Sequence, residues 1–173
     1  FKADALEQIR VMSRTIDEFR NFLRPDERHE RFPVARCLEE AVRLCSAQFR
    51  ERHIVQELRL PQGASPCGYG VPSQLTQTLL SLLASARDAT ADSRTRTGGT
   101  PEEGRVVLAL ADQGERLLIT VSDNGSGIPE EQRDRVFDPF VSTREDQSGS
   151  GLGLYIARTL VESGFGGTIS HTA

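Results

Sequence analysis

The sequence lacks several features that mark common classes of protein. It has no block of lysine or arginine and a formal net charge of −4, which argues against nucleic acid as a partner, because phosphate contacts need clustered cations. No apolar run approaches the roughly 18 residues of a membrane span, and the first residues show no signal-peptide pattern. We therefore expect no direct membrane contact from this chain. The three cysteines lack metal-type spacing, and Cys37 and Cys45 are expected to be buried thiols in a reducing compartment.

The two common phosphate-binding signatures are also missing. There is no G-x-x-x-x-G-K-[ST], and no βαβ unit carries G-x-G-x-x-G. Two other glycine clusters are present, at 123–129 and 149–154. The first follows an apolar run that predicts a buried strand, with the carboxylate of Asp123 at the strand end. The second opens a helical pattern, and helix N-termini favour phosphate. These clusters together predict one nucleotide held between two glycine loops.

The order of predicted helices and strands indicates an α+β fold, a two-layer α/β sandwich with a mixed, mostly antiparallel sheet covered by helices on one face. Segment 61–73 is turn-rich and 91–104 is expected to be a flexible loop. Strands 106–111 and 117–122 are close enough in sequence to predict an antiparallel hairpin. The remaining elements are predicted helices at 4–23, 34–49, 72–90, 129–136 and 152–163, a strand at 54–60, and a strand that begins at 168–170 and is not completed.

The first predicted helix has an apolar seam with spacings of three and four residues. The seam consists of Leu6, Ile9, Met12, Ile16, Phe19 and Leu23. Little sequence lies nearby for it to pack against before Pro25. We expect it to meet another helix, from a missing upstream segment or from a second chain; the alternative is a helix packed on its own domain.

Three motifs in order resemble the ATP-binding domain of sensor histidine kinases, within the GHKL group of gyrase, the large heat-shock chaperones, histidine kinases and mismatch-repair ATPases. Residues 123–129 resemble the G1 box, 137–140 the F box and 149–154 the G2 box. Residues 141–148 stand where the family has its ATP lid. Any one glycine motif is weakly specific, whereas the ordered set is strong. The Bergerat ATP-binding fold of the group is therefore the fold that the resemblance implies.

The resemblance also implies a domain organisation. Residues 1–24 resemble the second helix of the dimerisation and histidine-phosphotransfer element, 25–33 a linker, and 34–173 the catalytic domain with its last strand missing. The chain has no initiator Met, so we expect a fragment of a longer protein. The resemblance implies a homodimer through the N-terminal helix and a response regulator as partner. It also implies a cytoplasmic location, as a free protein or as the cytoplasmic part of a membrane-bound sensor.

The ligands that the resemblance implies are ATP and Mg²⁺. In the family the aspartate of the G1 box accepts a hydrogen bond from the adenine amino group, which is here Asp123. Arg144 takes the place of a lysine that reaches the phosphates, and it adds a forked donor geometry. The γ-phosphoryl group would pass to a histidine and then to an aspartate of the response regulator. The implied nucleotide-binding residues are Ser85, Asp88, Asp123, Gly125, Gly127, Ile128, Phe140, Thr143, Arg144, Gly149, Ser150, Gly151, Leu152, Gly153 and Leu154.

The N box departs from the family pattern. Residues 81–89 read Ser-Leu-Leu-Ala-Ser-Ala-Arg-Asp-Ala, where the family has roughly Asn-Leu-Leu-x-Asn-Ala-x-Asp-Ala. Ser81 and Ser85 share one helix face, and an Asn carbonyl is a better Mg²⁺ ligand than a Ser hydroxyl, which would act through a water. Either phosphates and water hold Mg²⁺ and activity survives in reduced form, or the domain is a pseudokinase that serves as a nucleotide-binding and dimerisation module.

Two further observations concern the branch of the GHKL group and the position of the phosphoacceptor histidine. The water-activating ATPases of the group place a glutamate general base at position 81, a task that serine cannot perform. An anti-sigma type serine-protein kinase is a third option, which the long N-terminal helix and the F box disfavour. His29 and Glu30 match the family's His-acid pair superficially, but they lie in the linker after the helix. We therefore expect the phosphoacceptor histidine upstream of this sequence and identify no catalytic residue within it.

Overall fold

The computed structural model describes residues 28–63, 65–96, 103–141 and 151–172. The described residues fall into two compact units, Arg28–Gly127 and the part of the chain within Ile128–Ala173, and each unit is described by itself. The predicted helix at 4–23, and with it the dimer contact, lies outside the described residues. No helix that the structure describes is long and apolar enough to cross a bilayer.

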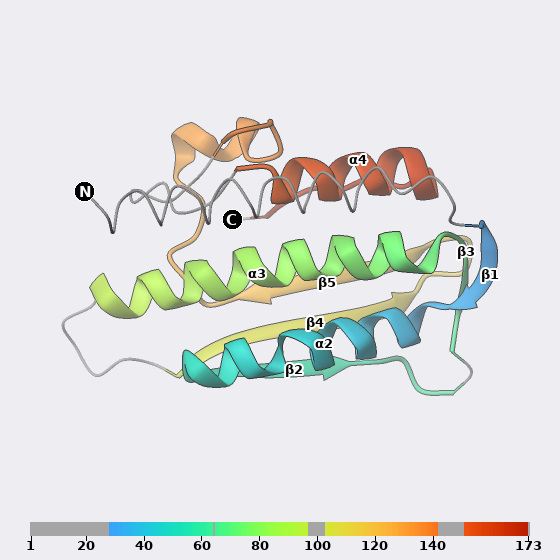
Figure 1. Ribbon diagram of the computed structural model, residues 1–173, viewed down its shortest axis with the longest axis horizontal. Helices are drawn as coiled ribbons and strands as arrows, with labels where there is room; N and C mark the ends of the chain where they lie inside the picture. The colour runs from blue at the N-terminus through green and yellow to red at the C-terminus, as the bar shows by residue number, and fades with distance from the viewer. Residues whose placement is uncertain (1–27, 64, 97–102, 142–150, 173) are drawn as a thin grey trace, which may run out of the picture. The chain divides into compact units, whose positions relative to one another are not determined.

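The first unit is built on a three-stranded sheet in the order β2–β4–β5 (Figure 1). Strand β2 (Ile54–Arg59) runs parallel to β4 (Gly104–Asp112), and β4 runs antiparallel to β5 (Leu117–Asp123). The predicted hairpin is confirmed. In β4 the side chains of Val106, Leu108 and Leu110 are buried, every second residue as the strand period requires. Helices α2 (Val34–Glu51) and α3 (Pro72–Arg96) pack on this sheet, so the layers are those of the predicted sandwich.

The core lies between the two helices and the sheet. Each helix buries one stripe of residues spaced by three and four, the pattern of an amphipathic helix. The buried residues are Val34, Ala35, Cys37, Leu38, Ala41, Cys45 and Phe49 in α2, and Leu75, Thr76, Thr78, Leu79, Leu83, Ala86 and Thr90 in α3. Cys37 and Cys45 are thus buried free thiols, as predicted, and burial raises the pKa of both. Burying a leucine such as Leu38 contributes roughly 1.5–3 kcal/mol.

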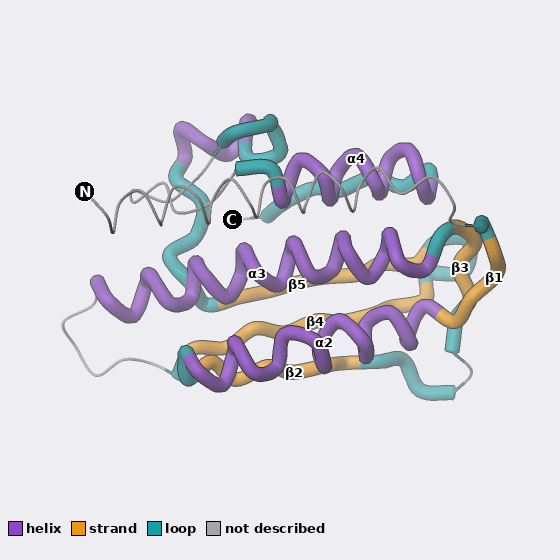
Figure 2. Tube along the Cα trace, in the orientation of Figure 1, coloured by secondary structure: helices purple, strands orange, loops and turns teal. Residues whose placement is uncertain are grey.

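A second, two-stranded sheet was not predicted. Strand β1 (Glu30–Pro33) pairs antiparallel with β3 (Cys67–Gly70), and Figure 2 shows the two short strands together at one end of the first unit. The interpretation of 30–33 as linker and of 67–70 as turn is therefore wrong. The segments are polar or glycine-rich, so neither shows strand periodicity alone. Their backbone groups find partners only when distant segments meet.

Helix α3 is longer than predicted. It runs to Arg96 instead of ending near Thr90, so the expected loop at 91–104 is shorter; residues 97–102 lie outside the described part. The residues from Asp92 to Arg96 are polar and lack apolar periodicity, but they include neither glycine nor proline. Nothing local stops the helix until glycines appear at 98 and 99.

The second unit contains the 3-10 helix η1 (Glu130–Arg135) and helix α4 (Gly153–Phe165), close to the two helices predicted there. Gly166 ends α4 in the left-handed conformation, with φ of 59°, a common helix stop. Residues 167–172 form neither helix nor strand, so the strand predicted to begin at 168 is wrong. Instead His171 Nε2 lies 2.9 Å from the carbonyl oxygen of Arg133, and its ring lies 6.3 Å from that of Phe137. These side-chain contacts of His171 therefore hold the segment 167–172, where a strand would need backbone hydrogen bonds to a neighbouring strand.

Candidate functional site

The Asp123 carboxylate stands at the end of β5, where the chain turns away from the sheet. Its Oδ1 accepts the Gly125 N–H at 2.9 Å, a local turn typical of aspartate. The residue is exposed, and none of the described residues donates a hydrogen bond to Oδ2. Partial desolvation raises the pKa of this carboxyl, and the bond from Gly125 lowers it by a smaller amount. One oxygen is therefore fixed, and the other can accept from a ligand.

The two glycines of this turn are needed for different reasons. A Cβ at position 125 would lie 2.5 Å from the carbonyl carbon of Ala89 and 2.7 Å from its oxygen. The Ser126 N–H also donates to that oxygen at 3.2 Å. Gly125 thus lets the turn rest on the backbone of α3. A Cβ at position 127 would meet open space, but Gly127 has a φ of +70°, which disfavours any other residue.

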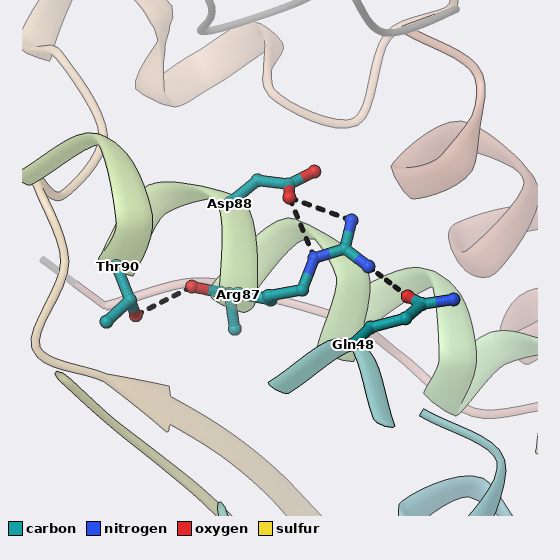
Figure 3. Close-up of polar contacts among 5 residues, drawn as sticks. Gln48, Arg87, Asp88 and Thr90 are labelled. Carbon is teal, nitrogen blue, oxygen red and sulfur yellow. Dashed lines mark hydrogen bonds and ion pairs between the residues drawn. The ribbon is translucent and has the colours of Figure 1, made fainter. Parts of the chain in front are cut away.

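Three polar residues of the N box lie outside the buried stripe of α3. Ser85 is exposed, and Ser81 and Asp88 are partly exposed, so none of the three lies in the buried stripe. Figure 3 shows that Asp88 is engaged: its Oδ1 accepts from Arg87 Nε at 2.8 Å and pairs with Nη2 at 2.8 Å. Arg87 also donates to Gln48 of α2. The pair therefore orients Asp88 and links two helices.

The described residues around the predicted metal position offer few strong magnesium ligands. Ser81 and Ser85 offer neutral hydroxyls, which are weaker Mg²⁺ ligands than carboxylate or amide oxygens. The nearby carboxylate of Asp88 is paired with Arg87. In the part of the chain that the structure describes, no three His, Cys, Asp or Glu residues cluster as metal ligands do. The predicted serine ligands are therefore weak metal ligands by themselves.

In the second unit a backbone hydrogen bond joins the F box to the G2 box. The Phe140 N–H donates to the carbonyl oxygen of Gly151 at 3.0 Å. A Cβ on Gly151 would lie 2.6 Å from the Phe140 carbonyl carbon, and Gly151 has a φ of +66°. Phe140 is 76% exposed and has a φ of +64°, an outlier for an aromatic residue. Phe140 and Gly151, which flank the segment predicted to be the lid, are therefore in direct contact.

Helix α4 begins within the G2 box, at its last two residues. Gly153 is its first residue, and the carbonyl of the buried Leu152 accepts from the Ile156 N–H at 2.8 Å. The N–H groups of the first helical turn have no partner within a helix and can bind an anion. Ile128, which begins this unit, accepts from Arg133 Nε through its carbonyl at 3.3 Å. The remaining predicted residues Thr143, Arg144, Gly149 and Ser150 lie outside the described residues.

One residue of the Asp123 turn escaped the sequence analysis. The Asn124 side chain accepts from the Arg105 N–H through Oδ1 at 2.7 Å and donates from Nδ2 to the Glu103 carbonyl at 3.0 Å. An Asn-Gly pair after a strand signals a turn, but its partners lie about 20 residues earlier in the chain and leave no local trace. The Gln48 contact to Arg87 is equally invisible in the sequence.

Comparison with known proteins identifies a family and several relatives of this chain. The family described as histidine kinase-, DNA gyrase B-, and HSP90-like ATPase matches residues 70–173. The nitrogen regulation protein NtrY of Azorhizobium caulinodans is 31% identical over 94% of this chain and 20% of its own length. The C4-dicarboxylate transport sensor protein DctB of Rhizobium meliloti is 32% identical over 96% of this chain and 26% of its own.

The solved structures add the fold. Histidine kinase ThkA, in complex with response regulator protein TrrA, superposes with a TM-score of 0.65 at 21% identity, covering 94% of this chain and 42% of that chain. The present chain spans 20% and 26% of the two curated relatives. Because the family match covers more than half of the residues and includes the G1 turn and the G2 helix, the chain belongs to the histidine kinase-, DNA gyrase B- and HSP90-like ATPases, as the ATP-binding catalytic domain of a sensor histidine kinase.

Proposed function

We propose that this domain binds ATP and transfers its γ-phosphoryl group to a histidine outside the present sequence, from which it passes to an aspartate of a response regulator. The observation that carries the proposal is the Asp123 carboxylate at the end of β5. One of its oxygens is held by Gly125, and no described residue donates to the other. Within the ATPase family this arrangement suits the amino group of adenine.

At the adenine end, the exocyclic amino group would donate to Asp123. A hydrogen bond to a charged group contributes roughly 1.5–3 kcal/mol, enough to select adenine over a purine without the amino group. The Gly125 contact with Ala89 keeps the turn on α3, so the carboxylate is positioned by backbone. Ser85, Asp88, Gly127 and Ile128 remain proposed nucleotide-binding residues, with Ser85 toward the phosphates.

At the phosphate end, the first turn of α4 and the glycines before it would bind the phosphates. Backbone N–H groups at a helix N-terminus are suited to this task. The proposed residues that the structure describes here are Phe140, Gly151, Leu152, Gly153 and Leu154. Thr143, Arg144, Gly149 and Ser150 stay predictions. Phosphoryl transfer would then depend mainly on positioning and charge neutralisation.

Magnesium would enter with the nucleotide, held by phosphates and water, since Ser81 and Ser85 offer no strong ligand. This same observation favours a second candidate: an attenuated kinase or pseudokinase that binds nucleotide and dimerises without efficient transfer. The two candidates differ in metal dependence. Metal-coupled ATP binding supports the kinase, and metal-independent or absent binding favours the second candidate.

The partners follow from the same proposal. A response regulator is proposed because the similar kinase ThkA is solved in complex with one, and a homodimer is proposed through the helix predicted at 4–23. A cytoplasmic location suits an ATP-dependent enzyme, and the buried free thiols Cys37 and Cys45 suit a reducing compartment.

Calorimetric titration of the chain with ATP, with and without Mg²⁺, tests the proposed function. Asp123→Asn should weaken ATP binding by roughly tenfold or more, because an amide replaces the ionised acceptor. Asp112→Asn is a matched control: Asp112 lies at the other end of the same hairpin, and its Oδ1 accepts the Gly114 N–H at the same 2.9 Å. Equal ATP affinities for the two variants would show that Asp123 does not hold adenine.

A further inference from the structure

Asn124 ties the Asp123 turn to the central strand of the sheet. The last residue pair in the β4–β5 ladder is Val106 with Asp123. One residue further, the Asn124 N–H still donates to the Arg105 carbonyl at 3.3 Å. The return bond, from the Arg105 N–H, goes to the side-chain Oδ1 of Asn124 at 2.7 Å. The side chain therefore replaces a backbone carbonyl at the point where the chain leaves the strand.

The second half of the same amide makes a second bond. Asn124 Nδ2 donates to the Glu103 carbonyl at 3.0 Å, so one side chain spans the entry of β4. That entry is also fixed from its other side, because Gly104 and Arg105 pair with Ile54 and Val55 of β2. The turn is thus joined to a strand that has neighbours on both sides.

We propose that Asn124 is a positioning residue that sets the direction of the Asp123 carboxylate, and so determines how strongly the site prefers adenine to a purine without the 6-amino group. The inference rests on the proposed function of Asp123. Asp123 and Gly125 flank Asn124, and their mutual bond at 2.9 Å spans it. A shift of residue 124 therefore moves both the carboxylate and the N–H that orients it.

Of asparagine, aspartate, serine and alanine, only asparagine can satisfy both partners at this position. Aspartate can accept from the Arg105 N–H, but its other oxygen would face the Glu103 carbonyl oxygen at about the distance of the present hydrogen bond, where two acceptors repel. Serine is too short to span both groups, and alanine has neither. Asn124→Ala thus removes both bonds, whereas Asn124→Asp removes one and sets two acceptors against each other.

The test compares the affinities of the whole chain for ATP and for purine riboside triphosphate, which lacks the 6-amino group. The wild-type chain should prefer ATP by roughly tenfold or more, the value of one hydrogen bond to a charged group. Asn124→Ala should reduce this ratio by at least about threefold, mainly by weakening ATP. Asn124→Asp should also reduce the ratio, because its second oxygen would repel the Glu103 carbonyl oxygen. The control Gln113→Ala, an exposed residue at the other end of the hairpin, should leave the ratio unchanged.

Each other outcome counts against the inference. Equal weakening of both nucleotides by Asn124→Ala would mean a purely structural role. A wild-type chain that binds both nucleotides equally would overturn the proposed function of Asp123 and the specificity role of Asn124 with it. Amide exchange of Gly125 then separates the two failures: faster exchange in Asn124→Ala than in Gln113→Ala means that Asn124 positions the turn without a ligand role, and equal exchange means that it does not position the turn at all.

Discussion

Gly125 lies so close to α3 that a Cβ on it would be 2.5 Å from the carbonyl carbon of Ala89. Both groups in this contact belong to backbone, so neither can move away as a flexible side chain could. The Ser126 N–H donates to the same Ala89 carbonyl. The turn that carries Asp123 is therefore seated on the helix that carries the N box, and any side chain at 125 must separate the two.

The first prediction concerns this contact. Gly125→Ala should lower the free energy of unfolding by roughly 1–3 kcal/mol, as overpacking does, and weaken ATP binding as the turn moves off α3. Gly114→Ala serves as the control, because position 114 has a φ of +84° and open space. It should cost about 1–2 kcal/mol of backbone strain with no change in ATP affinity. Thermal unfolding and calorimetric titration measure both quantities, and an unchanged ATP affinity in Gly125→Ala would contradict the argument.

The second prediction concerns pH. Desolvation raises the pKa of Asp123 in the folded chain above its usual range, so the folded state holds this proton more tightly than the unfolded state. The contribution of Asp123 to stability is then greatest below its unfolded pKa and is lost as pH rises through its folded pKa. Asp123→Asn should therefore melt at a higher temperature than wild type near pH 7, and the difference should shrink toward pH 3. A difference that grows on acidification would reverse the sign and refute the assignment.

The third prediction follows from the same ionisation. An amino donor favours the charged carboxylate, so ATP binding should lower the pKa of Asp123 and release protons at a pH near that of its unbound titration. Titrations in buffers of different ionisation enthalpy would detect the release. Purine riboside triphosphate, which lacks the donor, should release fewer protons. Equal release with both nucleotides would mean that another group is responsible.

The fourth prediction concerns the serines of α3. Ser85→Asn should strengthen binding of ATP with Mg²⁺ by roughly 1 kcal/mol, the size of one added polar contact, because an amide oxygen replaces a hydroxyl on the exposed face. Binding of ATP in the presence of a chelator should not change, which makes the metal-free titration the internal control. If the gain appears equally without Mg²⁺, residue 85 contacts nucleotide and not metal.

The fifth prediction concerns the link between α2 and α3. Arg87→Ala removes the partner of Asp88 and the donor to Gln48 (Figure 3). Since both charged side chains are mostly buried, with 15% and 16% exposure, the loss should be about 1–3 kcal/mol in urea unfolding. Gln48→Ala should cost about 0.5–1.5 kcal/mol. If the contact is real, the double variant should be less destabilised than the sum of the two single variants.

The sequence predicted the elements whose signals are local. The hairpin of β4 and β5, the buried stripes of α2 and α3, and the register that leaves Ser85 exposed all follow from periodicity within one segment. Pairings between distant segments were missed, as with β1 and β3, whose residues such as Arg31 and Tyr69 are paired across 38 positions of sequence. The strand expected at 168 failed for the converse reason, since a suitable composition does not supply a partner strand.

The residues of the G1, F and G2 boxes by themselves determined the family, because their order and spacing are properties of the chain alone. Only the tertiary structure decided how the Asp123 turn is held. Gly125 rests on the backbone of Ala89, and Asn124 bonds to Arg105 and Glu103. These contacts join segments about 20 to 36 residues apart, and their energies depend on distances of a few tenths of an ångström. A linear pattern identifies which residues are present at the site, whereas packing determines which of their atoms are already bound and which can accept a ligand.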